Sequence, residues 1–207
     1  MRILLDDQET NLRAETVGGA LQEAATLVER SGRLIVEVEV DGIAWCEEDL
    51  ANASHTARSA GEIRLLTAHP AELLRDTFTH ATEAVLNADE IQRSAAKLMQ
   101  SNREAEGMQK LLEALAIWGS AQTAVSRGLE LGVVSRAEIT AAGIDLDGAI
   151  SALDAQLRAL RAAMQSQDPT AVSDCLMYEF PATTKRFATT LAAIAREVAR
   201  RTGQNAR

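Results

Sequence analysis

Hydrophobic positions repeat with two different periods along this chain. The clearest short pattern is RLIVEVEV at residues 33–40, in which valine alternates with glutamate. Alternation with a period of two predicts a strand with one buried and one solvated face. Beyond Pro70, apolar residues recur every three or four positions, which predicts amphipathic helices. The change of period divides the chain into a mixed part, residues 1–68, and a helical part, residues 69–207.

The mixed part predicts several strands around one helix. Thr16 is a suitable N-cap for that helix, and Gly32 is a suitable residue for the turn that ends it. Asp41-Gly42 predicts a tight turn between two strands. A helical turn at 47–52 and a loop at 53–61 then precede the last strand. The predicted strands cover residues 2–5, 10–13, 33–40, 43–45 and 62–66.

This order of strands and helix resembles the β-grasp fold, in which a small sheet wraps one helix. The resemblance is closest to the sulfur-carrier branch of that family, through residues 1–5, Thr16-Val17 and residues 36–42. Those carriers end in a free Gly-Gly tail, whereas this chain continues through Thr67 and beyond. The resemblance therefore implies a fold, and no carrier residue is assigned from it.

The helical part predicts four long helices. Ser101 with Glu104 forms a capping-box pattern for the second helix, and Ser135 with Glu138 forms another inside the connector 129–148. Asp147 is the predicted cap of the third helix, and Asp168-Pro169 opens the fourth. Four amphipathic helices bury their apolar faces most simply as an antiparallel four-helix bundle. The predicted fold class of the whole chain is α+β. The apolar stripe of the first predicted helix consists of Leu74, Phe78, Ala81, Val85, Ala88, Ile91, Ala95 and Leu98.

Pro181 lies in the middle of the fourth predicted helix. The apolar phase is the same before and after it, which predicts one long helix with a kink. Phe180 and Phe187 then face the core, while Tyr178 and Glu179 lie off the apolar stripe. Tyr178 and Glu179 are therefore candidate partner-binding residues.

Trp45, on a short strand at the edge of the predicted sheet, is the third candidate partner-binding residue. An edge position could leave its large apolar ring partly exposed, as at an interface. Trp118, by contrast, lies on the apolar stripe of its helix and is expected in the core.

The net charge limits the classes of molecule expected to bind the protein, and the cysteine content indicates its compartment. The net charge is −9, and residues 1–69 hold 13 acidic and 6 basic side chains, a balance of −7. An acidic surface repels nucleic acid and anionic membranes, so neither is expected as a partner. Cys46 and Cys175 form no CxxC pair, which predicts neither a disulfide framework nor a zinc site and favours the cytoplasm. The sequence predicts no signal peptide and no membrane span.

Catalytic patterns are weak throughout. His80 and Glu83 have helical spacing but the reversed order of a di-iron motif, and Gly18-Gly19 fits no phosphate-binding loop. The acidic groups at 6–7 and 47–49 are explained by a turn and a helix start. The sequence therefore assigns no catalytic residue, cofactor or metal, although an enzymatic function stays among the alternatives.

Three classes of function follow. The first is a non-catalytic adaptor that binds a protein partner or a second copy of itself, using the acidic mixed part and the helices. The second is a cytoplasmic chaperone-like protein of a secretion or flagellar export system, since such chaperones resemble these acidic, aliphatic bundles in size and composition. The third is an enzyme with a site at the joint around residues 68–70.

Overall fold

The structure, a computed structural model, describes residues 1–205 and confirms an α+β chain. The chain divides into two compact units, Met1–Leu73 and Leu74–Arg207. We call them the sheet unit and the helical unit and describe each by itself. That they are independent domains with a boundary at residue 68 stays a prediction. No helix within the described residues is long and apolar enough to span a membrane.

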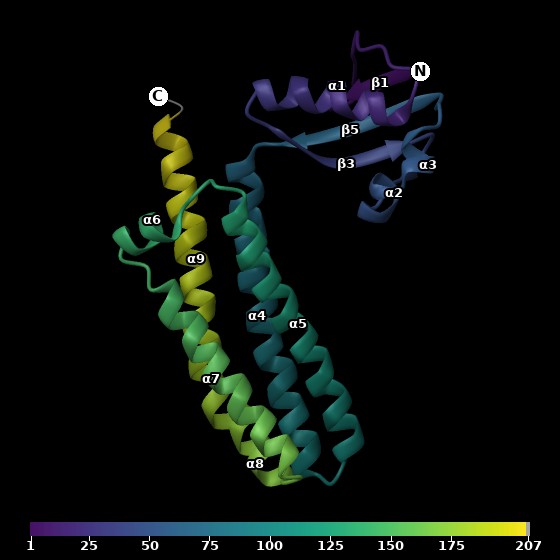
Figure 1. Ribbon diagram of the computed structural model, residues 1–207. Helices are drawn as coiled ribbons and strands as arrows, with labels where there is room; N and C mark the ends of the chain where they lie inside the picture. Colours follow the sequence, from purple (N-terminus) through teal and green to yellow (C-terminus); the bar gives the residue numbers. More distant parts are fainter. Residues whose placement is uncertain (206–207) are drawn as a thin grey trace. The chain divides into compact units, whose positions relative to one another are not determined.

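The sheet unit contains a five-stranded mixed sheet with the strand order β2-β1-β5-β3-β4. Strands β1 and β5 pair in parallel, and the other neighbours pair antiparallel. Helix α1 (Val17–Arg30) lies along the sheet, as Figure 1 shows, and the short helices α2 (Glu47–Ala51) and α3 (Ala53–Thr56) precede the last strand. The strands are β1 (Arg2–Leu5), β2 (Gln8–Glu9), β3 (Leu34–Val40), β4 (Ile43–Ala44) and β5 (Glu62–Ala68).

The core of the sheet unit lies between α1 and the sheet. Thr16 caps α1 by accepting a hydrogen bond from the Gly19 amide at 3.2 Å, and Gly32 ends it with φ of 68°. Both predicted helix signals are thus confirmed, as is the Asp41-Gly42 turn, where both residues have positive φ. The core side chains are aliphatic and almost fully buried: Ile3, Val17, Ala20, Ala24, Val38, Val40, Ile63 and Leu65.

Two strand predictions in this unit are wrong in detail. The hairpin return is at β2, immediately after a turn in which Asp6 and Asp7 both have positive φ, and not at residues 10–13. In β3 the pairing register shifts between Ile35 and Glu37, so Val36 has no partner and is 41% exposed. This bulge reverses the alternation, since an extra residue moves the following side chains to the opposite face. The predicted loop at 53–61 also contains α3.

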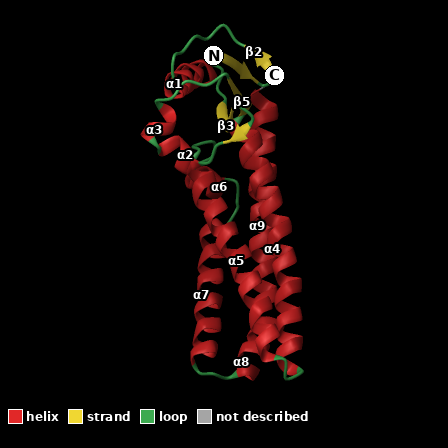
Figure 2. Ribbon diagram, turned by 90° about the vertical axis from the view of Figure 1, so that its right-hand side faces the viewer, coloured by secondary structure: helices red, strands yellow, loops and turns green. Residues whose placement is uncertain are grey.

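Four long helices dominate the helical unit. Figures 1 and 2 show α4, α5, α7 and α9 running alongside one another, with successive long helices in opposite directions. The short helix α8 leads without interruption into a π-helical segment, η1, and then into α9. The bounds are α4 (Pro70–Gln100), α5 (Glu104–Glu130), α6 (Arg136–Ala141), α7 (Leu146–Gln165), α8 (Pro169–Asp174), η1 (Cys175–Glu179) and α9 (Phe180–Asn205).

The predicted helix caps have mixed outcomes. The Ser135–Glu138 capping box is confirmed at the start of α6, and Asp168 with Pro169 opens α8. The Ser101–Glu104 box is wrong, because the Ser101 hydroxyl donates to the Lys97 carbonyl at 2.8 Å instead of capping α5.

The predicted cap of the third long helix is also wrong. Helix α7 begins two residues early, with Asp145 as the cap that accepts from the Gly148 amide at 2.9 Å. Asp147 lies in the first turn of α7 and pairs with Arg136. Arg186 of α9 pairs with Asp145, so each of the two aspartates has an arginine partner.

The core of the helical unit contains four of the six aromatic residues, Phe78, Trp118, Phe180 and Phe187. Trp118 on α5 contacts Phe180 and Phe187, with ring centroids 6.0 and 5.7 Å apart, and all three side chains are almost fully buried. The predicted burial of Trp118 and the two phenylalanines is confirmed. Toward the end of α4 the buried face includes Gln92, Ala96 and Met99, so the predicted stripe through Ile91 and Leu98 is only partly buried there.

Candidate functional site

The π-helical segment presents Tyr178 to solvent. Tyr178, the only tyrosine, is 72% exposed, whereas Phe180 two residues later is fully buried. Glu179 accepts a hydrogen bond from the Gln156 amide of α7 at 3.0 Å, and the same amide contacts the Cys175 sulfur at 3.0 Å. Burial raises the pKa of the Cys175 thiol, and the carboxylate of Glu179 adds to that rise. Tyr178 and Glu179 therefore lie together at the surface, with Glu179 anchored to α7.

Pro181 accounts for the π-helical segment, a wide turn within the single long helix that the sequence predicts. A proline inside an α-helix has no N–H and its ring crowds the carbonyl four residues earlier. Here the Phe180 amide instead donates to the Cys175 carbonyl five residues back, which widens the turn before the proline. The apolar positions 172, 176 and 180 are spaced by four, more than the α-helical repeat of about 3.6 residues. The wider turn absorbs this excess and keeps all three buried.

Trp45 lies in the sheet unit beside the end of β4 and is half-buried against the core. The Arg58 guanidinium lies 5.2 Å from the centre of its ring, and the His55 ring lies 5.9 Å away. Cations favour the face of an indole, so Arg58 already covers part of this surface. Ile43, two residues earlier on β4, is 63% exposed. We call Ile43 and Trp45, at this edge of the sheet beside the Arg58 guanidinium, the apolar patch.

Asp49 organises the polar side of this patch. It accepts hydrogen bonds from the Cys46 amide at 3.1 Å, from the Cys46 thiol at 3.2 Å and from His55 Nδ1 at 3.1 Å. The Cys46 backbone hydrogen bond is the main reason that the pKa of Asp49 is lowered. The carboxylate lies between the thiol and the imidazole, so the arrangement holds α2 and α3 together.

Two of the weaker chemical candidates, Asp6 and Gly18, have structural roles. Asp6 accepts hydrogen bonds from the Thr67 hydroxyl and amide, which lower its pKa and tie the β1–β2 turn to β5. A Cβ on Gly18 would lie 3.2 Å from the Thr56 carbonyl, so this glycine allows α1 to approach α3. His80 and Glu83 are both exposed on α4, and within residues 1–205 no three His, Cys, Asp or Glu side chains gather as metal ligands.

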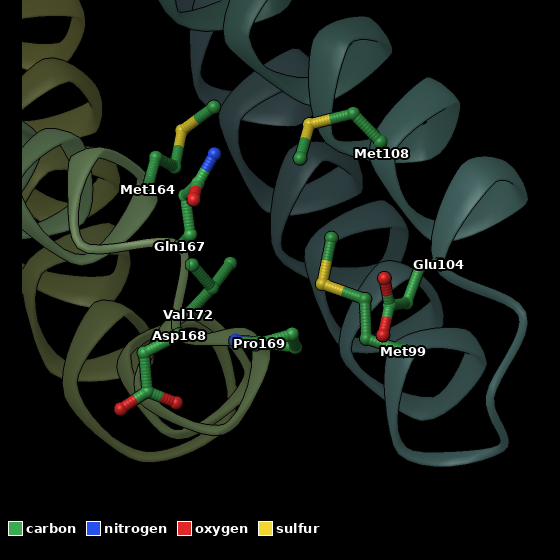
Figure 3. A pocket seen from close by; sticks show the side chains of 8 residues that line it. All are labelled: Met99, Glu104, Met108, Met164, Gln167, Asp168, Pro169 and Val172. Carbon is green, nitrogen blue, oxygen red and sulfur yellow. The ribbon is translucent and has the colours of Figure 1, made fainter.

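A cavity in the helical unit was not predicted from the sequence. Its volume is about 220 Å³ and it lies where α4, α5, α7 and α8 end or begin. Figure 3 shows Met99, Glu104 and Met108 on one side of it, facing Met164, Gln167 and Val172 on the other. Three of the five methionines thus line one cavity. The predicted antiparallel helices place residues near 100 and 166 at the same end of the helical part. That placement was the sequence signal available for this cavity.

Four buried polar atoms lack hydrogen-bond partners among the described residues. They are both amide atoms of Gln92, Oδ1 of Asp89 and the indole nitrogen of Trp118. The Gln92 side chain is fully buried. An unpaired buried polar group costs about 1–3 kcal/mol, so Gln92 is an energetic weakness in the core.

Comparison with known proteins finds no family model, no curated protein and no solved structure that matches this chain.

Proposed function

We propose that the protein is a non-catalytic adaptor that binds a protein partner, combining a β-grasp-like unit with a four-helix bundle. The single observation that carries the proposal is Tyr178. The other large aromatic rings of the helical unit are buried in its core, whereas Tyr178 exposes 72% of its surface on a distorted turn.

Tyrosine is enriched at protein interfaces and among the residues that dominate their binding energy. Its ring offers apolar area, and its hydroxyl offers a hydrogen bond, with only two side-chain torsions to order. π-helical turns are also frequent at functional sites. Glu179 beside it contributes a negative charge, so the interface favours a partner with basic or hydrogen-bond-donating groups.

The sheet unit supports a second contact through side chains. Its strand order and the single helix along the sheet agree with the β-grasp interpretation. Its edge strands β2 and β4 each have only two residues, too short to template an added strand. The patch of Ile43 and Trp45 offers apolar contact area instead.

The test begins with a photo-crosslinking amino acid placed at position 178 of the full-length protein. Position 112 is the matched control, since Leu112 is also apolar and 58% exposed in the helical unit. We expect one protein to cross-link from 178 and not from 112. Cross-links from 112 alone would favour the export-chaperone alternative, and cross-links from neither would contradict both.

The partner found in this way is then purified and titrated against two variants. Tyr178→Ala should weaken binding about tenfold or more, as is typical of an interface anchor. Pro181→Ala should restore α-helical hydrogen bonding and weaken binding, because the lost π turn rotates Tyr178 by roughly 100° relative to Phe180. If Pro181→Ala leaves binding unchanged, the distorted turn has no part in recognition.

A further inference from the structure

We propose that the methionine-lined cavity and the polar cavity beside it form one binding site for a small amphipathic molecule. The ligand would place a short alkyl or aryl group among the methionines and a head that donates hydrogen bonds in the polar part. This site is independent of the partner-binding surface at Tyr178.

The apolar part is large enough for such a group. Its volume is about 220 Å³, whereas an engineered apolar cavity of about 150 Å³ is known to bind benzene. Met99, Met108, Met164, Pro169 and Val172 supply its apolar lining. Sites between the helices of a helical protein commonly have this concave, mainly apolar form.

Methionine suits a ligand pocket better than a fixed core. Its unbranched, polarisable side chain adapts to different shapes, so three methionines form a lining that can close around a guest. Gly107 helps to keep this space, because a Cβ there would lie 2.7 Å from Met99 Cγ and 2.9 Å from the Ala95 carbonyl. Met99 can therefore lie against α5 only because residue 107 has no side chain.

The polar part adjoins the apolar part directly. The second cavity, of about 260 Å³, shares Met99, Glu104 and Pro169 with the first and is otherwise lined by polar side chains, Gln100, Asn102, Thr170 and Ser173. Ser173 is 1% exposed, and its hydroxyl contacts the Ala96 carbonyl only at 3.4 Å. The hydroxyl donates this bond and keeps its acceptor lone pairs, so it can accept a hydrogen bond from the head group of the ligand.

Glu104 determines which head group fits. It lines both cavities, and within the described part of the chain its carboxylate has no hydrogen-bond or ion-pair partner. An alcohol or an ammonium group can donate to this carboxylate, whereas a carboxylate head would be repelled. The site should therefore discriminate against anionic amphiphiles.

Gln167 gives independent support. It has φ of 53° in the turn between α7 and α8, a position where glycine is favoured and other residues cost about 1–2 kcal/mol. Its side chain lines the methionine cavity, and Figure 3 shows its amide between Met164 and Val172. The amide of Gln167 can therefore donate or accept a hydrogen bond at the wall of the cavity.

The experiment uses the full-length protein labelled with ¹³C at its methionine methyl groups and followed by NMR. The probes are 1-octylamine, 1-octanol and octanoate, all below their aggregation limits. We expect saturable shifts of Met99, Met108 and Met164, with Met1 and Met177 unchanged as internal controls. Octylamine and octanol should bind about tenfold more tightly than octanoate. Shifts at all five methionines would mean non-specific adsorption, and no shifts at any probe concentration would also overturn the proposal.

Charge substitutions test the head-group assignment. Glu104→Gln should reduce the preference for octylamine over octanoate severalfold and leave the methionine shifts with octanol in place. The matched control is Glu130→Gln, at the opposite end of α5, which should preserve the preference. If octanoate binds as tightly as octylamine to the unmodified protein, or if both variants behave alike, the assignment of Glu104 is wrong.

Discussion

Two glycines on the same helix should respond in opposite directions to the same substitution. A Cβ on Gly107 would lie 2.7 Å from Met99 Cγ and 2.9 Å from the Ala95 carbonyl oxygen, whereas a Cβ on Gly119 would meet nothing within 4 Å. Both residues are in α5, so the gain in helix propensity is the same for both. We therefore expect Gly119→Ala to stabilise the protein and Gly107→Ala to destabilise it.

The magnitudes follow from two opposing effects. Replacing glycine by alanine inside a helix stabilises it by about 1 kcal/mol, and this is the whole effect at Gly119. At Gly107 the methyl group collides with backbone as well as side-chain atoms, and overpacking of this kind costs about 1–3 kcal/mol. Because the backbone of α4 cannot rotate away as a side chain can, we expect the upper part of that range. The two variants should then differ by about 2–3 kcal/mol.

Urea unfolding followed by far-ultraviolet circular dichroism measures this difference directly. The control is the slope of the unfolding transition, which should be equal in both variants if only the folded state is affected. The reasoning would be refuted if the free energies of unfolding of the two variants agreed within about 0.5 kcal/mol, since α4 and α5 would then not be in close contact at Gly107.

Three further predictions concern the core, the charges and the two units. Gln92→Met should raise the free energy of unfolding by about 1–3 kcal/mol, because it removes an unpaired buried amide. The control, Gln156→Met, removes a paired amide and should not raise it. A lower free energy of unfolding for Gln92→Met would show that the Gln92 amide is hydrogen-bonded to internal water. The pKa of Glu138 is lowered from 4.5 to about 2, chiefly by the hydrogen bond from the Ser135 amide. The pKa of Glu197 is also lowered from 4.5 to about 2, chiefly by hydrogen bonds from Arg200 and Arg201. Because these folded-state pKa values lie below 4.5, the stabilisation is complete above that pH and is lost as the pH falls toward about 2, which urea midpoints measured from pH 5 to 2 should show. Deleting residues 1–68 should leave a helical fragment that melts cooperatively by circular dichroism, and a gradual transition would mean that the two units share a core.

Local signals in the sequence were sufficient for much of the fold. The Thr16 cap, the Gly32 turn, the Ser135–Glu138 box and the Asp168-Pro169 start each depend on a few adjacent residues, and each is confirmed. The change of period at Pro70 likewise located the start of the helical region, because α4 begins there.

The features that the sequence did not predict depend on distant partners. The bulge at Val36 is set by the pairing of β3 with β5, and Asp145, the cap of α7, pairs with Arg186 forty-one residues later. The methionine cavity likewise requires the ends of four helices to meet, which periodicity along a single helix does not reveal. The position of Tyr178 at the surface was predictable from its phase, but the π turn beneath it was not.

The two tryptophans are divided between the two units, and this gives the protein two separate optical reporters. Trp118 is enclosed by Phe180 and Phe187, so its emission should be that of an indole in an apolar medium. Trp45 lies half-buried beneath the Arg58 guanidinium, where contact with water and a nearby charge gives a different spectrum. With either one replaced by phenylalanine, the fluorescence of the other would report on the sheet unit or the helical unit alone.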